Sequence, residues 1–111
     1  MGDRRKEGPG LHIDRVIHEP ARLLITAYLY VVEDADYVFL MQNTGLTWGN
    51  LSSHLSKLEE AGYVQLTKTF VDRKPHTVVR LTDPGRVAFD AYRRQMKALF
   101  EDLPDSGSDS R

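Results

Sequence analysis

Cysteine is absent from the sequence, which excludes disulfide bonds, thiolate zinc sites and cysteine nucleophiles. The longest apolar run, LLITAYLYVV at 23–32, spans ten residues and is too short to cross a bilayer as a helix. The charged, glycine-rich segment 1–10 lacks the apolar core of a secretory signal. These absences lead us to expect a cytoplasmic protein without a membrane segment.

The sequence also lacks the common signatures of catalytic and cofactor sites. It contains no HExxH motif and neither of the phosphate-binding patterns GxxxxGK and GxGxxG. Its histidines, at 12, 18, 54 and 76, do not have the close spacing of metal ligands. Ser52 and Ser53 adjoin His54, but side chains at successive helix positions point apart and cannot form a nucleophile–base pair. We therefore expect no enzyme activity, no cofactor and no metal site.

Neither sign of charge dominates, since 15 lysines and arginines stand against 16 carboxylates and the formal net charge is −1. A nucleic-acid-binding domain is usually basic. The charges are unevenly spread: between Leu46 and Arg80, five cations stand against three carboxylates, for a local net charge of +2. A local excess of this kind can steer a protein toward a polyanion. The charge pattern therefore permits DNA binding without indicating it.

The length of 111 residues suits one domain and is too short for two separate cores. The composition predicts a flexible leader over 1–10 and a disordered polar tail over 104–111. One folded domain is expected between them, over 11–103.

The first part of this domain has helical spacing, which begins near Ile13. Pro20 suits the first turn of a further helix, where its missing N–H costs nothing. The pattern of 21–32 is apolar almost all round, which predicts that protein surrounds this helix on most sides. In a domain this small, we expect part of that surface to meet a second subunit.

Two short helices joined by a glycine-containing turn are predicted next. Asp36 suits the N-cap of the first, which covers 37–43 and ends at Gly45 in a left-handed turn. Thr47 suits the N-cap of the second, which extends over 48–61 and has an apolar stripe of Leu51, Leu55 and Leu58. Such a pair is either a helix-turn-helix or a plain αα-hairpin of a helical bundle.

The segment after these helices has the pattern of a β-hairpin. The stretch YVQLTKTF at 63–70 alternates apolar and polar residues, and TVVRL at 77–81 is a second β-branched run. The polar connection VDRKPH lies between them and carries the basic residues Arg73, Lys74 and His76. A helix-turn-helix followed directly by a basic-tipped hairpin has the element order of a winged helix.

A last helix is predicted over 84–103. Thr82 suits its N-cap, and Asp83 and Pro84 suit its first turn. Its apolar stripe is long for a domain that three other helices already close: Ala88, Tyr92, Met96, Leu99 and Leu103. We therefore expect this helix to form a homodimer interface together with the helix at 21–32, and packing within a single core is the alternative.

Three segments together, LTWGNLSSHLSKLEEAGYV, FVDRKPHTVVRLT and GRVAFDAY, resemble the stand-alone winged-helix transcriptional regulators of bacteria and archaea in the ArsR/MarR-like group. The similarity runs from His18 to Tyr92. It implies an α+β, mostly helical fold, with a three-helix core, a β-hairpin wing and a flanking C-terminal dimerisation helix. It also implies a homodimer that binds double-stranded DNA, with the helix at 47–61 in the major groove and the wing at 68–77 on the backbone or in the minor groove.

The resemblance identifies candidate DNA-binding residues in both elements. The helix carries small polar side chains where a surface helix would carry lysine and glutamate, and its candidates are Thr47, Trp48, Gly49, Asn50, Ser52, Ser53, His54 and Lys57. The candidates in the wing are Lys68, Arg73, Lys74 and His76. Two residues depart from the usual pattern of the group: the bulky Trp48 in the first turn of the helix, and Asp72 at the wing tip.

Several of these assignments have alternatives. The Asn50 carboxamide can pair with adenine, which is worth roughly 1–3 kcal/mol of discrimination, or cap the helix through Thr47. Gly49 costs about 1 kcal/mol of helix stability relative to alanine, and either close approach of DNA or tight packing in the turn would explain it. Trp48 can pack on the core or lie against a sugar or a thymine methyl group.

Two wider alternatives remain at this stage. The wing can be a solvated hairpin, and the whole domain can be a protein–protein interaction module that does not bind DNA. A small-molecule effector is unknown from the sequence. If one exists, we expect its pocket near aromatic residues of the dimer interface, namely Tyr28, Tyr30, Tyr92 and Phe100.

Overall fold

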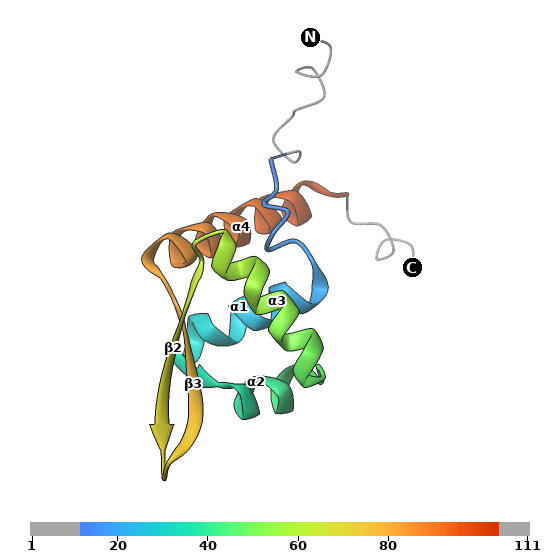
Figure 1. Ribbon diagram of the computed structural model, residues 1–111. Helices are drawn as coiled ribbons and strands as arrows, with labels where there is room; N and C mark the ends of the chain where they lie inside the picture. The colour runs from blue at the N-terminus through green and yellow to red at the C-terminus, as the bar shows by residue number, and fades with distance from the viewer. Residues whose placement is uncertain (1–11, 105–111) are drawn as a thin grey trace.

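The computed structural model describes residues 12–104. Four helices and three strands follow one another along the chain (Figure 1): α1 (Pro20–Val32), β1 (Asp34–Asp36), α2 (Tyr37–Thr44), α3 (Trp48–Glu60), β2 (Val64–Val71), β3 (Lys74–Leu81) and α4 (Asp83–Asp102). This order confirms the predicted α+β winged helix with a C-terminal helix. The predicted leader at 1–10 and tail residues 105–111 lie outside the described residues.

The ends of the helices follow from local chemistry. The side chains of Asp36 and Thr47 accept hydrogen bonds from backbone N–H groups in the first turns of α2 and α3, which satisfies donors that a helix leaves unpaired. Gly45 ends α2 with φ of 75°, and Thr82 caps α4. Pro20 lies in the first turn of α1. All these boundaries confirm the sequence prediction.

The predicted helical start near Ile13 is wrong. The segment before α1 is a single turn: the Asp14 carboxylate accepts hydrogen bonds from the backbone N–H groups of Val16 and Ile17, and the Asp14 carbonyl oxygen accepts one from the His18 N–H. The turn is not continued as a helix before α1 begins at Pro20. Ile17 is nonetheless fully buried, against Phe89 of α4. The apolar positions were therefore core residues presented by a turn.

The acidic segment after α1 forms a strand that the sequence did not predict. β1 pairs antiparallel with β3, with Asp34 opposite Arg80 and Ala35 opposite Val79, so the sheet order is β1-β3-β2. The Arg80 guanidinium donates two hydrogen bonds to the Asp34 carboxylate, at 2.6 and 3.0 Å. These hydrogen bonds lower the pKa of Asp34 below its ordinary value. Residues 34–36 are therefore a paired edge strand.

The wing is longer and its turn tighter than predicted. β2 and β3 pair in register from Val64–Leu81 to Val71–Lys74, so the polar connection predicted over 71–76 is mostly strand. Only Asp72 and Arg73 form the turn, with φ of 53° and 69°. Two-residue hairpin loops with positive φ at both positions match the twist of their strands. This geometry explains how the strands continue to the tip.

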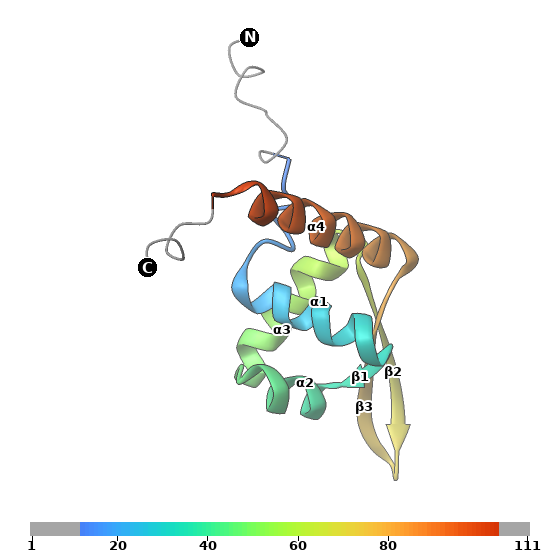
Figure 2. The ribbon, with the colours of Figure 1, turned by 180° about the vertical axis from the view of Figure 1, so that it is seen from behind.

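The core lies where α1, α2 and α3 meet the sheet. Leu51, Leu55 and Leu58 of α3 are fully buried against Ile25 and Leu29 of α1, as the stripe predicted. A second, smaller cluster joins the N-terminal turn to α4, which crosses one end of the helical core (Figures 1 and 2). The wing projects past the opposite end. None of the helices within residues 12–104 is both long and apolar enough to cross a membrane.

Candidate nucleic-acid interface

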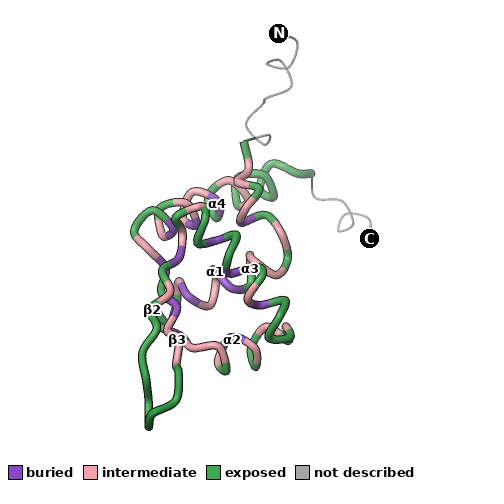
Figure 3. The backbone as a smooth tube through the Cα atoms, in the orientation of Figure 1, coloured by how far each residue is buried: buried purple, intermediate pink, exposed green. Residues whose placement is uncertain are grey.

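The outer face of α3 is polar, small and exposed. Because the leucine stripe turns inward, the opposite face presents Gly49, Asn50, Ser53 and Lys57 to solvent, with Thr47 and Trp48 at the helix start. Figure 3 shows the exposed outer side of α3 beside its buried positions. The first acidic residue of the helix is Glu59, near its C-terminus. An anion can therefore approach the first three turns without meeting a carboxylate of this helix, and the helix N-terminus favours negative charge.

Gly49 has open space around it. A Cβ atom built on this residue would meet no atom within 4 Å, and its φ is not in the left-handed region. Tight packing, one of the two explanations offered by the sequence, is therefore wrong for this residue. Close approach of a ligand is the explanation of the two that the open space at Gly49 allows.

The Asn50 carboxamide is free to bind a ligand. Thr47 caps the helix by accepting a hydrogen bond from the backbone N–H of Asn50, at 3.2 Å. The Asn50 side chain is exposed and forms no hydrogen bond with any other part of residues 12–104. The capping bond therefore belongs to the backbone of Asn50, and its side chain keeps both its donor and its acceptor groups.

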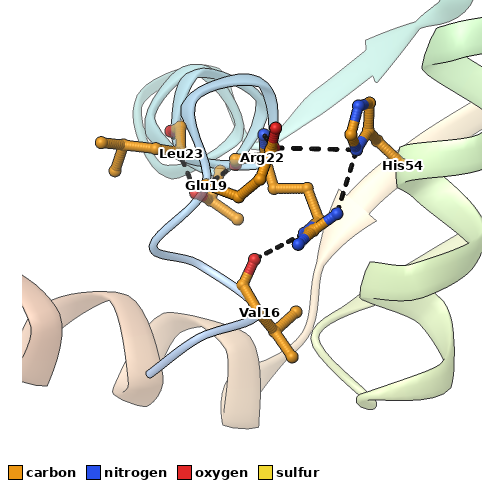
Figure 4. A network of polar contacts seen from close by, with 6 residues as sticks. Val16, Glu19, Arg22, Leu23 and His54 are labelled. Atoms are coloured by element: carbon orange, nitrogen blue, oxygen red, sulfur yellow. Dashed lines mark hydrogen bonds and ion pairs between the residues drawn. The ribbon is translucent and has the colours of Figure 1, made fainter. Parts of the chain in front are cut away.

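His54 and Ser52 point sideways rather than outward. The Arg22 guanidinium donates to His54 Nδ1 at 3.1 Å and to the Val16 carbonyl oxygen at 2.6 Å. The Glu19 carboxylate lies 3.7 Å from the same ring nitrogen (Figure 4). Ser52 Oγ lies 3.5 Å from the Tyr37 hydroxyl. These contacts tie α3 to α1, to the N-terminal turn and to α2, and so fix the helix in place.

The wing carries its cations near the tip. Lys68 on β2, Arg73 in the turn and Lys74 at the start of β3 are exposed, and none forms an ion pair within residues 12–104. His76 is half-buried, with its Nε2 atom 3.7 Å from an Asp36 carboxylate oxygen. The left-handed backbone of Arg73 costs a non-glycine residue about 1 kcal/mol or more. A long basic side chain is thus retained where glycine would be easier to accommodate.

The wing and α3 flank a single open groove of about 830 Å³. Trp48, Ser52 and Ser56 line it from α3, and Lys68 and Phe70 line it from β2. His76 and Asp36 are also at its wall. The groove therefore brings together four of the predicted candidates, Trp48 and Ser52 of the helix and Lys68 and His76 of the wing. The other candidates do not line it: Thr47, Gly49, Asn50, Ser53, His54, Lys57, Arg73 and Lys74.

Phe70 is a groove residue that the sequence prediction missed. Its side chain is 72% exposed, and it shares a strand face with Val64, Leu66 and Lys68 because side chains alternate along a strand. Val64 is buried beneath this face. The alternation was visible in the sequence and, extended to residue 70, would have placed Phe70 beside Lys68.

Of the four aromatic residues expected around an effector, Tyr30 and Tyr92 lie in the same small cluster with Phe89, and the other two lie elsewhere in the single chain. Tyr28 packs edge-on against Phe39 of α2, with ring centroids 6.1 Å apart. Tyr30 instead contacts Phe89 of α4, at 5.0 Å, and Phe100 is exposed near the end of α4. Within residues 12–104, no cluster of three or more histidine or carboxylate side chains could hold a metal ion.

Comparisons with known proteins agree with this architecture. A family model described as a winged helix DNA-binding domain matches residues 21–100. An uncharacterized protein of Methanocaldococcus jannaschii is 34% identical over 89 residues, which cover 80% of this chain and 97% of that protein. The structure of a transcriptional regulator homologue from Pyrococcus horikoshii is 30% identical with a TM-score of 0.77, covering 93% of this chain and all of the other.

A more distant match shows the fold alone. A MarR-family transcriptional regulator from Silicibacter pomeroyi is 22% identical with a TM-score of 0.60, covering 93% of this chain and 68% of the other. The fold and family are those of regulators rather than enzymes. With the exposed polar helix and basic wing, the match over 21–100 shows that this chain belongs to the winged helix DNA-binding domain family of transcriptional regulators.

Proposed function

We propose that the protein is a homodimeric, sequence-specific regulator that binds double-stranded DNA through α3 and the wing together. The observation that carries this proposal is the groove between α3 and the wing, which Trp48 and Ser52 line from one side and Lys68 and His76 from the other. Asn50 on α3 and the wing-tip cations Arg73 and Lys74 are also exposed. A helix and a hairpin so arranged fit a duplex with α3 in the major groove and the wing over the backbone or the adjacent minor groove.

In α3, residues of the first two turns recognise the bases. The Asn50 carboxamide pairs with an adenine edge, and Ser53 donates to a base or a phosphate. Gly49 lets the DNA come close to the helix backbone. Thr47 lies at the helix N-terminus, which attracts a phosphate, and Lys57, two turns further along, binds the backbone.

The wing supplies charge. Lys68, Lys74 and His76 contact phosphates, and Arg73 enters the minor groove, where a narrow groove concentrates negative potential. Ser52 and His54 flank the recognition surface and hold α3 in position through their contacts with Tyr37 and Arg22. Because its target is DNA, the protein acts in the cytoplasm of a bacterial or archaeal cell.

The dimer is proposed to form through α1 and α4. Apolar side chains of both helices are exposed in the single chain: Leu24, Val31, Val32, Val87, Leu99 and Phe100. Exposed apolar side chains on neighbouring elements are typical of a protein interface. A two-fold dimer predicts a pseudo-palindromic operator with half-sites about one helical turn apart.

Fluorescence anisotropy with a random-sequence duplex tests the proposal. We expect the wild type to bind at low salt and the double variant Arg73→Ala/Lys74→Ala to bind at least tenfold more weakly, because it loses phosphate contacts. The control Arg15→Ala/Arg94→Ala removes the same charge from exposed positions outside the groove and should bind like the wild type. A folded wild type that does not bind at low salt contradicts DNA binding and favours a protein–protein interaction module.

A further inference from the structure

Trp48 is an exposed aromatic residue at the start of α3, whose other exposed residues in the first two turns are small and polar. It is the first residue of α3, and 62% of its surface is exposed. It belongs to neither of the buried apolar clusters. Core packing, one explanation offered by the sequence, therefore does not account for it.

The indole ring is nevertheless held in place. It packs against the Tyr37 ring at the start of α2, with centroids 5.7 Å apart and the planes inclined by 35°. The Tyr37 hydroxyl in turn lies 3.5 Å from Ser52 Oγ, one turn along α3. A supported ring loses little conformational freedom when it binds a ligand. Its outer side thus forms a small, fixed apolar surface at the mouth of the groove between α3 and the wing.

The major groove offers one apolar group to such a surface. Among the base edges exposed there, only thymine carries a methyl group, at C5. The first residues of a recognition helix are those that reach the base edges. We infer that Trp48 contacts the C5 methyl group of a thymine and makes a thymine preferred at that position of each half-site. This inference rests on the proposed DNA-binding function.

Two alternating duplexes, dA–dT and dA–dU, test the inference without knowledge of the operator, because they differ only in the C5 methyl group. Affinities are measured by competition for the wild type and for Trp48→Ala, Trp48→Phe and Phe70→Ala. The wild-type dimer should prefer dA–dT roughly 15-fold, because burying one methyl group is worth roughly fourfold and each of the two half-sites contributes one. Trp48→Ala should lose this preference, and Trp48→Phe should keep part of it. Phe70→Ala, a control that removes the other exposed aromatic residue of the groove, should retain it.

The outcomes separate this inference from the proposed function. If the wild type binds both duplexes equally, the methyl contact is overturned while DNA binding stands. If Trp48→Ala binds both duplexes more weakly by the same factor and keeps the preference, Trp48 touches the sugar or only supports the helix, which also overturns the contact. If the wild type binds neither duplex at low salt, the proposed function fails and this inference fails with it.

Discussion

Gly49 is unfavourable for helix stability, and we propose that it favours DNA binding. Its helix position has ordinary φ and open surroundings, so the folded chain alone gives no reason for glycine. Replacing it with alanine, Gly49→Ala, should stabilise the protein by up to about 1 kcal/mol. The added methyl group should weaken DNA binding roughly tenfold, because it occupies space at the closest approach. Thermal unfolding checks the expected rise in stability, and fluorescence anisotropy checks the expected fall in DNA affinity. An unchanged DNA affinity would contradict close approach of DNA at this residue.

Tyr63 connects the end of α3 to the N-terminal turn and makes stability depend on pH. Its hydroxyl donates to the Asp14 carboxylate, and this bond, with some desolvation, raises the pKa of Tyr63 from 10.0 to about 12. The folded protein thus favours the neutral phenol. The resulting stability is fully present below pH 10 and is lost as pH rises toward 12.

The variant Tyr63→Phe isolates this contribution. Below pH 10 it should lower the free energy of unfolding by about 1 kcal/mol, because the hydrogen bond is lost. The difference from the wild type should shrink as pH approaches 12, where the wild-type phenol ionises. Urea unfolding of both proteins at matched pH values measures it. A difference that stays constant over this range would show that the hydrogen bond does not control the ionisation.

For single residues, the sequence predicted those features that depend only on residues close by in the chain. Asp36 and Thr47 were identified as caps because a cap acts on the next few residues. The orientation of His54 could not be predicted, since its partner Arg22 lies 32 residues away on α1. Gly85 shows the same limit: a Cβ there would lie 2.1 Å from the Tyr63 carbonyl oxygen, a contact that exists only after the wing has folded back.

Among the elements, the wing turn is the one where substitutions should best distinguish effects on stability from effects on DNA binding. Asp72 and Arg73 both adopt left-handed backbone, which costs a non-glycine residue about 1 kcal/mol or more. Asp72→Gly and Arg73→Gly should therefore each stabilise the hairpin by about 1 kcal/mol. Only Arg73→Gly should weaken DNA binding, since only it removes a cation. Chemical unfolding and anisotropy measure the two effects, and equal DNA affinities for these variants would exclude Arg73 from the interface.

The elements predicted well were those with long, periodic patterns. The leucine stripe identified α3, and alternation identified the wing. β1 was missed because three residues, Asp34–Asp36, carry no usable period, and the strand exists only through its pairing with β3. The connection between the two strands of the wing was predicted to be longer than it is, because Pro75 and His76 resemble turn residues. In the structure, Pro75 pairs with Phe70 and His76 pairs with Thr69.

At the scale of the whole molecule, the prediction concerns the proposed homodimer. Leu99 and Phe100 are exposed near the end of α4, so replacing them should leave the fold intact. Leu99→Ser/Phe100→Ser should convert the proposed dimer into a monomer and reduce DNA affinity at least tenfold, because half-site binding loses its partner. Sedimentation equilibrium measures the mass. Val38→Ser, at an exposed position on α2 that lines the groove, is the control for the mass alone. A wild-type monomer would contradict the dimer.

The sequence could indicate this interface only indirectly, through an apolar stripe longer than one core needs. The structure refines the stripe: Phe89 and Tyr92 close the second core cluster, while Leu99, Phe100 and Leu103 remain exposed. The sequence had left Phe89 out of the stripe. Which surface covers the exposed positions depends on a second chain, and no pattern within one chain determines it.

We propose that α3 and the wing bind the same DNA duplex, and the salt dependence of the DNA affinity is the measurement that checks this proposal. Plotted on logarithmic axes, the wild-type affinity should fall with salt by several units of slope, since each phosphate contact contributes about 0.9. In a dimer, Lys57→Ala should lower the slope by about 2 units and Arg73→Ala/Lys74→Ala by roughly 3 to 4, and the combined variant should show the sum. A shallow wild-type slope, or slopes that these variants do not change, would contradict the account.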